Sequence, residues 1–333
     1  MKHKRYLLQV IGSTLAALLL VACSGASRLT PTPILLTPTL AALPDTSPSP
    51  TTSANTPAPP EPSNTAGLGS IERDVTYCTI DGVALKMDVY TPGTMTTPAP
   101  VVVYVHGGGW TGGDKASGGE RERQELLVRG YLVVAVNYRL APEYKFPAQI
   151  EDVKCAVRHL RANVAAYNLD PDRIGAWGNS AGGHLVSLLG VTDASAGFEG
   201  SGGYADQSSR VQAVVDGYGP ADLTQDFSRF SSWGNRVFGV TESSSQIIVR
   251  ASPVTYVSSD DPPFLILQGE NDTLVPPSQS ETLYQCLTAA GVPATLVMVE
   301  NAGHGLKPVG GAMSPSRSEI TQIIADFFDE RLK

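Results

Sequence analysis

Short apolar runs alternate with segments of helical periodicity between residues 71 and 333, and this alternation limits the possible folds more than any other feature. Such runs read APVVVYV, YLVVAV, RIGAWG, VQAVV and FLILQ. They lack the strict polar–apolar alternation of a half-exposed strand, so each predicts a strand that is buried on both faces. A further pair of runs is joined at Asp81-Gly82, which predicts a hairpin. We therefore expect an α/β fold, with a mostly parallel sheet that carries helices on both faces.

One of these runs ends in a turn that is rich in glycine. The stretch RIGAWGNSAGGHL places Ser180 between Gly178 and Gly182, at the point where a strand would give way to a helix. This Gly-x-Ser-x-Gly pattern is typical of a serine nucleophile held on a tight strand-to-helix turn. The pattern is short enough to occur by chance, and Ser180 could be a turn residue only, so its interpretation depends on the rest of the chain.

Three other strand ends carry reactive residue types in a particular order. His106 and three glycines follow an early strand, Asp272 follows FLILQG, and His304 follows LVMVEN. The order of serine, acid and histidine is that of the α/β-hydrolase fold. A serine hydroxyl is a weak nucleophile at neutral pH, so it needs a base such as histidine, and a carboxylate orients that base. We therefore expect Ser180, Asp272 and His304 to act as nucleophile, acid and base.

A reaction at Ser180 also needs hydrogen-bond donors for the oxyanion that forms on the attacked carbonyl. The N–H group of Ala181 lies at the start of the predicted helix, where the helix dipole favours negative charge. The glycines at 107–109 let the backbone approach a substrate closely and can offer further N–H groups.

The other histidines of the domain have structural interpretations. His106 precedes the glycines and is expected to hold that loop by a hydrogen bond. His159 lies among basic residues on a helical segment and is expected on a solvated face. His184 lies one turn into the helix after the serine and is expected in its packing. Only His304 stands in a glycine-flanked loop after a late strand.

Three carboxylates compete for the role of the acid. Asp272 is favoured, Glu270 is its near neighbour, and Asp222 follows the run VVDGYGPA. A fourth, Asp152, is expected to form a structural ion pair with Arg139 rather than to take part in catalysis.

The first 22 residues predict export. A basic start, KHKR, precedes an apolar stretch from Tyr6 to Leu20, as in a secretory signal peptide. The motif LVAC then ends at Cys23 and resembles the lipobox of bacterial lipoproteins, in which the cysteine is acylated and becomes the new N-terminus. An uncleaved signal anchor is the alternative, although the apolar stretch is short for a span of about 20 residues. We expect an exported protein held on the bacterial cell membrane by lipid at Cys23, facing the exterior or the periplasm.

Composition separates a tether from the domain and narrows the possible partners. Residues 23–70 are rich in Pro, Thr and Ser and show no periodicity, so we expect a disordered tether before a catalytic domain at 71–333. The net charge of −8 makes nucleic acid a poor partner.

The three cysteines of the domain are Cys78, Cys155 and Cys286. Their spacing suggests no metal site, and three cysteines allow one disulfide at most. Cys155 lies on a helical segment and is expected to pack in the core. No cofactor is expected.

Six stretches of the domain are specific enough to identify relatives. They read YVHGGGWTGGDK, NYRLAPEYKFPAQIEDVKCAVRHLRAN, DPDRIGAWGNSAGGHL, VQAVVDGYGPADL, SPVTYVSSDDPPFLILQGENDTLVP and NAGHG. Together they resemble the hormone-sensitive-lipase-type esterases, and most of all the branch of bifunctional feruloyl and acetyl-xylan esterases. The resemblance covers nearly all of residues 71–333. It implies the α/β-hydrolase fold, with Ser180 as nucleophile, Asp272 as acid and His304 as base. It also implies an oxyanion hole formed by the backbone N–H groups of Gly108, Gly109 and Ala181.

The chain departs from that family in two places that affect substrate choice. The cap helices that larger relatives carry at the N-terminus are not visible, and Asn179 stands in the elbow where acidic residues are frequent. The segment from Gln225 to Tyr256 is then the expected cover of the site. Its aromatic side chains can either wall a pocket or pack between helices; they are Phe227, Phe230, Trp233 and Phe238.

These observations predict a serine carboxylic-ester hydrolase that works through an acyl-enzyme on a small-molecule ester. A site covered by one short segment buries few methylenes, so it favours acetyl to butyryl groups over long acyl chains. Acetylated sugars and feruloyl esters are candidate substrates. A formamidase or amidase of the same fold is one alternative, and a non-catalytic surface-binding lipoprotein is another.

Overall fold

The computed structural model describes residues 67–95 and 98–333. The predicted signal peptide at 1–22, the predicted lipidation site Cys23 and most of the predicted tether lie outside these described residues. The first strand begins at Leu68, earlier than the predicted domain, and Leu68 and Ser70 already pair with Pro92 and Thr91 of the next strand. The tether prediction is therefore wrong for residues 68–70, whose backbone belongs to the sheet.

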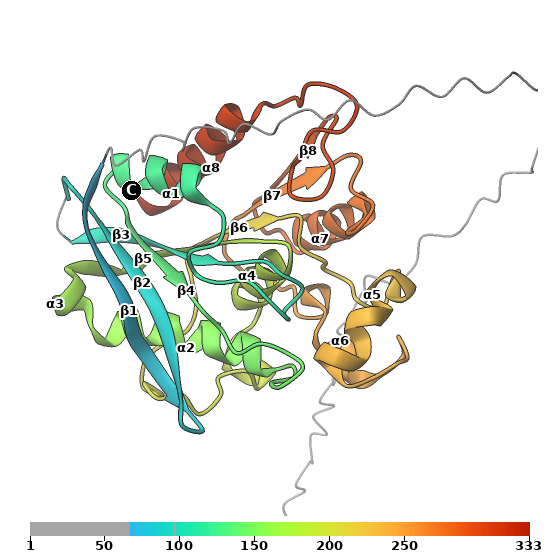
Figure 1. Ribbon diagram of the computed structural model, residues 1–333, viewed down its shortest axis with the longest axis horizontal. Helices are drawn as coiled ribbons and strands as arrows, with labels where there is room; N and C mark the ends of the chain where they lie inside the picture. Colours follow the sequence, from blue (N-terminus) through green and yellow to red (C-terminus); the bar gives the residue numbers. More distant parts are fainter. Residues whose placement is uncertain (1–66, 96–97) are drawn as a thin grey trace, which may run out of the picture. The chain divides into compact units, whose positions relative to one another are not determined.

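Within the described residues, eight strands form one mostly parallel sheet at the centre of the domain (Figure 1). Their order is β1-β2-β4-β3-β5-β6-β7-β8; β2 is antiparallel to both its neighbours, and all pairs from β4 to β8 are parallel. The strands span Leu68–Ile80 (β1), Val83–Pro92 (β2), Ala99–Val105 (β3), Leu132–Val136 (β4), Leu169–Asn179 (β5), Ala213–Gly217 (β6), Phe264–Gly269 (β7) and Ala294–Val299 (β8). The predicted α/β-hydrolase fold is confirmed.

The hairpin between β1 and β2 forms where the sequence predicts it. Asp81 and Gly82 have φ values of 50° and 81°, and a two-residue turn of type I′ needs positive φ at both positions. Ile80 and Val83 pair directly across the turn. The Asp-Gly pair therefore sets the register of the sheet's first edge.

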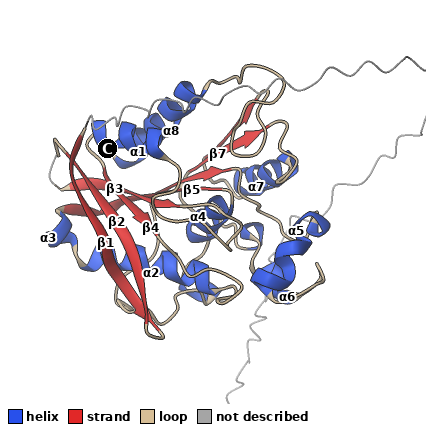
Figure 2. Ribbon diagram, in the orientation of Figure 1, coloured by secondary structure: helices blue, strands red, loops and turns tan. Residues whose placement is uncertain are grey.

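Helices cover both faces of the sheet (Figure 2). We call the packing beneath α2, α4 and α7 the larger core, and the packing beneath α1 and α8 the smaller core. The helices span Glu120–Val128 (α1), Ala148–Ala162 (α2), Val164–Tyr167 (α3), Ala181–Val191 (α4), Phe227–Trp233 (α5), Gln246–Arg250 (α6), Pro277–Ala289 (α7) and Arg317–Leu332 (α8). No helix in residues 67–95 and 98–333 has the length and apolarity needed to cross a bilayer.

Side chains of the central strands enter the two cores alternately. On β3, Val101, Val103 and Val105 lie in the larger core, whereas Val102 and Tyr104 lie in the smaller one. This period of two is the geometry of any strand. Because both sides are covered, both sets are apolar, which explains the continuous apolar runs in the sequence.

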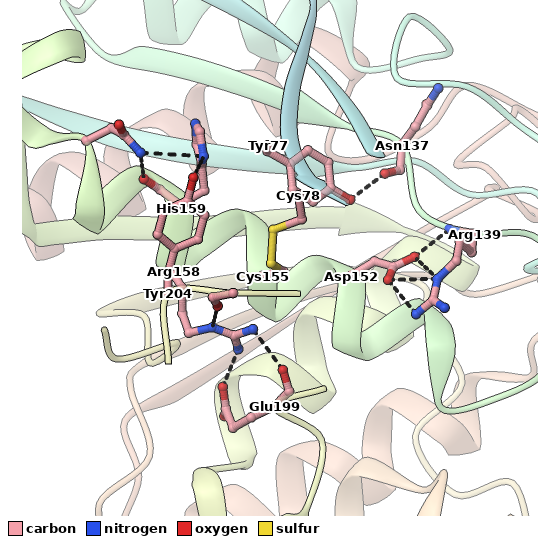
Figure 3. The surroundings of a disulfide bond; sticks show 12 residues. Tyr77, Cys78, Asn137, Arg139, Asp152, Cys155, Arg158, His159, Glu199 and Tyr204 are labelled. Atoms are coloured by element: carbon pink, nitrogen blue, oxygen red, sulfur yellow. Dashed lines mark hydrogen bonds and ion pairs between the residues drawn. A yellow bond between two sulfur atoms is a disulfide. The ribbon is translucent and has the colours of Figure 1, made fainter. Parts of the chain in front are cut away.

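The structure corrects the prediction for Cys155. This residue on α2 is fully buried, but its sulfur is bonded to Cys78 of β1 rather than packed alone (Figure 3). The two Cα atoms are 6.5 Å apart and the residues are separated by 77 positions. The disulfide therefore ties the edge strand of the sheet to a helix of the larger core.

The predicted solvated face around His159 is also wrong. His159 is only 6 % exposed, and its ring nitrogens contact two tyrosine hydroxyls at 3.0 and 3.1 Å. Lys154 and Arg158 on the same helix are buried and form ion pairs with Glu199. Figure 3 shows the pair of Arg158 and Glu199. The loop that carries Glu199 covers this face of α2, so the two basic side chains share one carboxylate inside the domain instead of facing water.

The predicted ion pair of Arg139 and Asp152 is confirmed. The guanidinium of Arg139 donates from Nε and Nη2 to the carboxylate at 2.8 to 3.0 Å, and the backbone N–H of Arg139 donates to it as well (Figure 3). Burial raises the pKa of Asp152 to about 6 even though the guanidinium opposes this shift. The pair holds the segment after β4 against the start of α2.

Candidate active site

Ser180 occupies the sharp turn between β5 and α4. Its backbone has φ 55° and ψ −119°, a conformation that costs an L-residue energy and persists only when its surroundings hold it. The N–H of Ser180 donates to the carbonyl of Gly217 at 2.7 Å, and the carbonyl of Ser180 accepts from the N–H of His184 at 3.0 Å. A Cβ on Gly178 or Gly182 would collide with neighbouring backbone atoms, so the glycines of the pattern have a steric reason.

Three distant segments bring Ser180, Asp272 and His304 into one hydrogen-bonded row. Nδ1 of His304 lies 2.7 Å from Oδ2 of Asp272, and Nε2 of His304 lies 3.0 Å from Oγ of Ser180. Because the carboxylate can only accept, Nδ1 of a neutral ring carries the proton and Nε2 accepts from the hydroxyl. Oδ1 of Asp272 accepts from the N–H groups of Leu274 and Val275, both at 2.9 Å, which fixes the carboxylate.

The row is buried at one end and open at the other. The Asp272 side chain is fully buried, whereas the His304 side chain is 26 % exposed. A molecule in the cavity therefore reaches the histidine and the serine, but not the carboxylate.

Neither alternative acid contacts His304. Asp222 accepts from Thr224 and Gln225, and these bonds hold the turn at the start of the segment above the site. Glu270 is exposed on the loop after β7 and makes none of the contacts of His304. Among the residues that the structure describes, no group of three or more His, Cys, Asp or Glu side chains is placed to hold a metal ion.

Three residues that line a cavity beside Ser180 have backbone N–H groups that donate to no other group in the described part of the chain: Gly108, Gly109 and Ala181. Gly108 and Gly109 have φ values of 113° and 59°, which favour glycine. Ala181 is the first residue of α4, and the first N–H groups of a helix have no partner within it. These three groups are therefore available to a bound molecule.

The cavity has a volume of about 550 Å³. It lies at Ser180, and its lining includes residues from both cores of the domain. We call one part of it the polar end, which is lined by Tyr104, Ser117, Gly118 and Asn179. The hydroxyl of Tyr104 donates to the carbonyl of Ser117 at 2.9 Å, and the Tyr104 ring packs in the smaller core. The polar end therefore lies over the face of the sheet that α1 and α8 cover.

The opposite part of the cavity is apolar, and we call it the aromatic end. It is lined by Trp110, Phe230, Trp233 and Val275. These residues belong to the larger core or pack against it. The aromatic end therefore lies over the other face of the sheet, so the two ends differ both in chemistry and in position.

The segment expected to cover the site does so with only part of its aromatic residues. Phe230 and Trp233 line the cavity. Phe238 instead packs inside the domain, with its ring centroid 5.5 Å from that of Trp110 and 5.8 Å from that of Phe146. Each of the two interpretations of these aromatic residues therefore holds for some of them.

Two further histidines support the site without entering its row of hydrogen bonds. Nδ1 of His184 accepts from the indole N–H of Trp110 at 3.2 Å, and burial lowers the pKa of His184 to about 4. Nδ1 of His106 donates to the carbonyl of Gly107 at 2.7 Å, and its ring stacks on Tyr138. The predictions that His184 packs and that His106 holds the glycine loop are confirmed.

The sequence analysis did not identify Asp216, whose hydrogen bonds hold the loop that contacts the Ser180 turn. This buried residue near the end of β6 accepts from the hydroxyl of Ser187 and from the N–H of Gly219, both at 2.9 Å. These bonds hold the loop whose Gly217 carbonyl accepts from Ser180. Burial raises the pKa of Asp216 to about 6. A signal was present in the sequence, since VVDG places an acid inside an apolar run.

Comparison with known proteins identifies relatives for this arrangement. Residues 87–287 match the family model described as BD-FAE. A protein of Mycobacterium tuberculosis named probable carboxylic ester hydrolase LipM is 38 % identical over 192 residues, which are 56 % of this chain and 44 % of that protein. Esterase LipC of the same organism is 32 % identical over 240 residues, which are 70 % of this chain and 59 % of LipC. The chain spans about half the length of these curated relatives.

Two solved structures match over almost their whole length. A truncated carbohydrate esterase from gut microbiota has a TM-score of 0.72 at 30 % identity and covers 79 % of this chain and 96 % of its own. An acetyl ester-xyloside bifunctional hydrolase from Caldicellulosiruptor lactoaceticus has a TM-score of 0.66 at 25 % identity, with coverage of 80 % and 98 %. Since the family model also matches more than half of the sequence, this chain belongs to the BD-FAE family.

Proposed function

We propose that this protein is a serine carboxylic-ester hydrolase that works through an acyl-enzyme. One observation carries the proposal: the two ring nitrogens of His304 lie 2.7 Å from a buried carboxylate and 3.0 Å from a serine hydroxyl on a strained elbow. The names of the relatives, among them esterase and carboxylic ester hydrolase, support the same activity. In this proposal Ser180 is the nucleophile, His304 the base and Asp272 the acid that orients it.

Proton transfer through His304 drives both halves of the proposed reaction. Nε2 takes the hydroxyl proton of Ser180 while Oγ attacks the ester carbonyl carbon. Asp272 keeps Nδ1–H in place and stabilises the imidazolium. The imidazolium then gives its proton to the departing alcohol oxygen, which leaves the acyl group on Ser180. A water molecule repeats the two steps and releases the acid.

The proposed oxyanion hole uses the backbone rather than side chains. As Oγ attacks, the carbonyl oxygen gains negative charge and needs donors that are already in position. The N–H groups of Gly108, Gly109 and Ala181 donate to nothing else in the described residues. One such donor typically contributes about 10²- to 10³-fold to the rate.

For the substrate we propose esters of short acyl groups, with acetylated sugars and feruloyl esters as candidates. The cavity of about 550 Å³ beside Ser180 has to hold both the acyl group and the alcohol, and the rings of Trp110, Phe230 and Trp233 line its apolar end, which leaves little room for a long acyl chain. Two structural relatives are named a carbohydrate esterase and an acetyl ester-xyloside hydrolase, which supports this choice.

We also propose that the protein is exported and anchored by lipid at Cys23. The motif LVAC supports lipidation at this cysteine. The bond between Cys78 and Cys155 supports export, because structural disulfides are typical of proteins outside the reducing cytosol. One acyl chain gives only marginal membrane binding, so lasting attachment needs the two or more chains of a lipoprotein anchor.

A fluorophosphonate probe tests the proposed activity directly. It should label the wild type at Ser180, and Ser180→Ala should remain unlabelled and lose about 10⁶-fold in kcat on p-nitrophenyl acetate. Ser195→Ala is a matched control, because Ser195 is exposed and its side chain bonds, within the described residues, to Asp193 alone. Comparing esters with formamides on the same preparation separates an esterase from an amidase. A folded wild type that is neither labelled nor active on esters would refute the proposal.

A further inference from the structure

The position of His304 determines on which side of Ser180 the alcohol departs. Nε2 has to return a proton to the alcohol oxygen, so this oxygen must lie near the imidazole. The His304 ring lies edge-on to the ring of Tyr218, with centroids 5.1 Å apart. Tyr218 packs in the smaller core together with Tyr104. The alcohol therefore leaves toward the polar end of the cavity.

The acyl group points away from the side on which the alcohol leaves. In the tetrahedral intermediate the reacting carbon carries Oγ of Ser180, the oxyanion at the glycine loop, the alcohol oxygen near His304 and the acyl chain. Three of these four directions are taken by the serine, the N–H groups and the imidazole. The acyl chain consequently points away from His304, into the aromatic end over the larger core.

Trp233 stands where the aromatic end meets the glycine loop. A Cβ built on Gly109 would lie 2.6 Å from Nε1 and 3.1 Å from Cε2 of the indole, so the ring lies directly against this loop. The ring centroids of Trp110 and Phe230 are both 6.2 Å from that of Trp233. These three rings together close the aromatic end.

Of the three rings, only that of Trp233 borders both the cavity and the outside of the domain. Trp110 and Phe230 are 3 % and 1 % exposed and form part of the larger core, whereas Trp233 is half-buried. Its helix α5 is fixed to the loop of the acid, because Arg229 donates to the carbonyl of Thr273 at 3.0 Å. The Trp233 ring is thus held in a fixed position between the cavity and the solvent.

We infer that Trp233 closes the acyl-binding end of the cavity and sets the longest acyl group that the enzyme accepts. This inference rests on the esterase function proposed above. With the ring in place, a short acyl group fills the space between Ser180 and the wall. Without it, the volume of the indole becomes free beside the rings of Trp110 and Phe230, and additional methylenes can be buried there.

The test is kcat/KM for p-nitrophenyl esters from acetyl to decanoyl, measured below their aggregation limits. The wild type should be most active on acetyl to butyryl esters. Trp233→Ala should raise the ratio of octanoyl to acetyl activity at least tenfold, since each newly buried methylene contributes about fourfold. Trp233→Phe keeps an aromatic wall and should retain the short-chain profile. Where the alanine variant does not fold, Trp233→Leu should show a smaller shift in the same direction.

Two controls test whether a changed acyl profile in Trp233→Ala comes from loss of the ring itself or from a general loosening of α5. Phe227→Ala removes an aromatic ring from the same helix, but Phe227 packs beside Gly234 and does not line the cavity, so the acyl profile should stay unchanged. A series of acetates with different alcohols should keep its order of activity in Trp233→Ala, because the alcohol occupies the other end.

An unchanged acyl profile in folded Trp233→Ala and Trp233→Leu would overturn the inference, as would a wild-type maximum at ten or more carbons. A changed preference for the alcohol in place of the acyl group would overturn it too. Failure of the esterase proposal looks different: the wild type then hydrolyses no ester of either series and takes no fluorophosphonate at Ser180.

Discussion

Trp110 donates its indole N–H to Nδ1 of His184 at 3.2 Å, and this bond ties the glycine loop to the helix that follows Ser180. Nε2 of the same ring donates to the carbonyl of Ala251 at 2.7 Å, on the segment above the site. A neutral imidazole satisfies both partners, one as acceptor and one as donor. Protonation of Nδ1 would remove the acceptor of the Trp110 bond, so acid weakens the contact that holds the glycine loop to α4.

We expect His184 to make the fold sensitive to acid. Burial lowers its pKa to about 4 from an ordinary value of 6.5, so between these values the unfolded chain binds a proton that the folded chain does not. Its contribution to stability is therefore complete above pH 6.5 and is lost as the pH falls toward 4. From pH 7.5 to pH 5, the wild type should lose about 2 kcal/mol relative to His184→Gln, which cannot titrate. Urea unfolding of both proteins at the two pH values measures this change, and a constant difference would contradict it.

Asp272→Asn should keep the geometry of the row but offer His304 an amide in place of a carboxylate. The wrong tautomer of His304 is then favoured, and kcat should fall about 10⁴-fold with little change in unfolding. Glu270→Gln and Asp222→Asn are matched controls that should stay close to the wild type, because neither carboxylate contacts His304. A mild effect in Asp272→Asn together with a severe one in either control would reassign the acid.

The disulfide should stabilise the domain without affecting the reaction. It closes a long loop, because Cys78 and Cys155 have a sequence separation of 77, so the unfolded chain loses much of its conformational freedom. The double variant Cys78→Ala/Cys155→Ala should lose about 2–4 kcal/mol in free energy of unfolding. Its kcat should match the wild type, because neither cysteine lines the cavity. Urea unfolding with and without reductant checks the assignment, since reductant should weaken only the wild type.

Cys23→Ala should abolish incorporation of a labelled fatty acid and release the protein from the membrane fraction. The expectation follows from the acyl-cysteine chemistry of the LVAC motif. Activity of the released variant should equal that of the anchored protein, which makes turnover a control for folding. Wild-type protein that takes up no label and is recovered entirely in the soluble fraction would refute the anchor.

Local chemistry explains which features could be predicted from the sequence. A continuous apolar run predicts a strand covered on both faces wherever it occurs, and Asp81-Gly82 predicts its turn through backbone conformation alone. The elbow around Ser180 is local only in part: a Cβ on Gly178 would meet the backbone of Gly182 within the same strand–turn–helix unit, whereas a Cβ on Gly182 would meet the carbonyls of Val105 and His106 at the end of β3. Local sequence therefore determined the α/β alternation, the hairpin and the glycine at position 178, whereas the strained backbone of Ser180 also depends on its bond to the Gly217 carbonyl of β6.

Tertiary structure decided every feature that depends on which segments meet. Cys155 and His159 lie on a helix whose sequence allows either packing or exposure, and the arrival of β1 and of the Glu199 loop determined their surroundings. Trp233 lines the cavity while Phe238 packs inside, although both belong to one aromatic segment. The reason is physical: the exposure of a side chain and the partner of a charge depend on distances between residues far apart in sequence, and only the folded chain sets those distances.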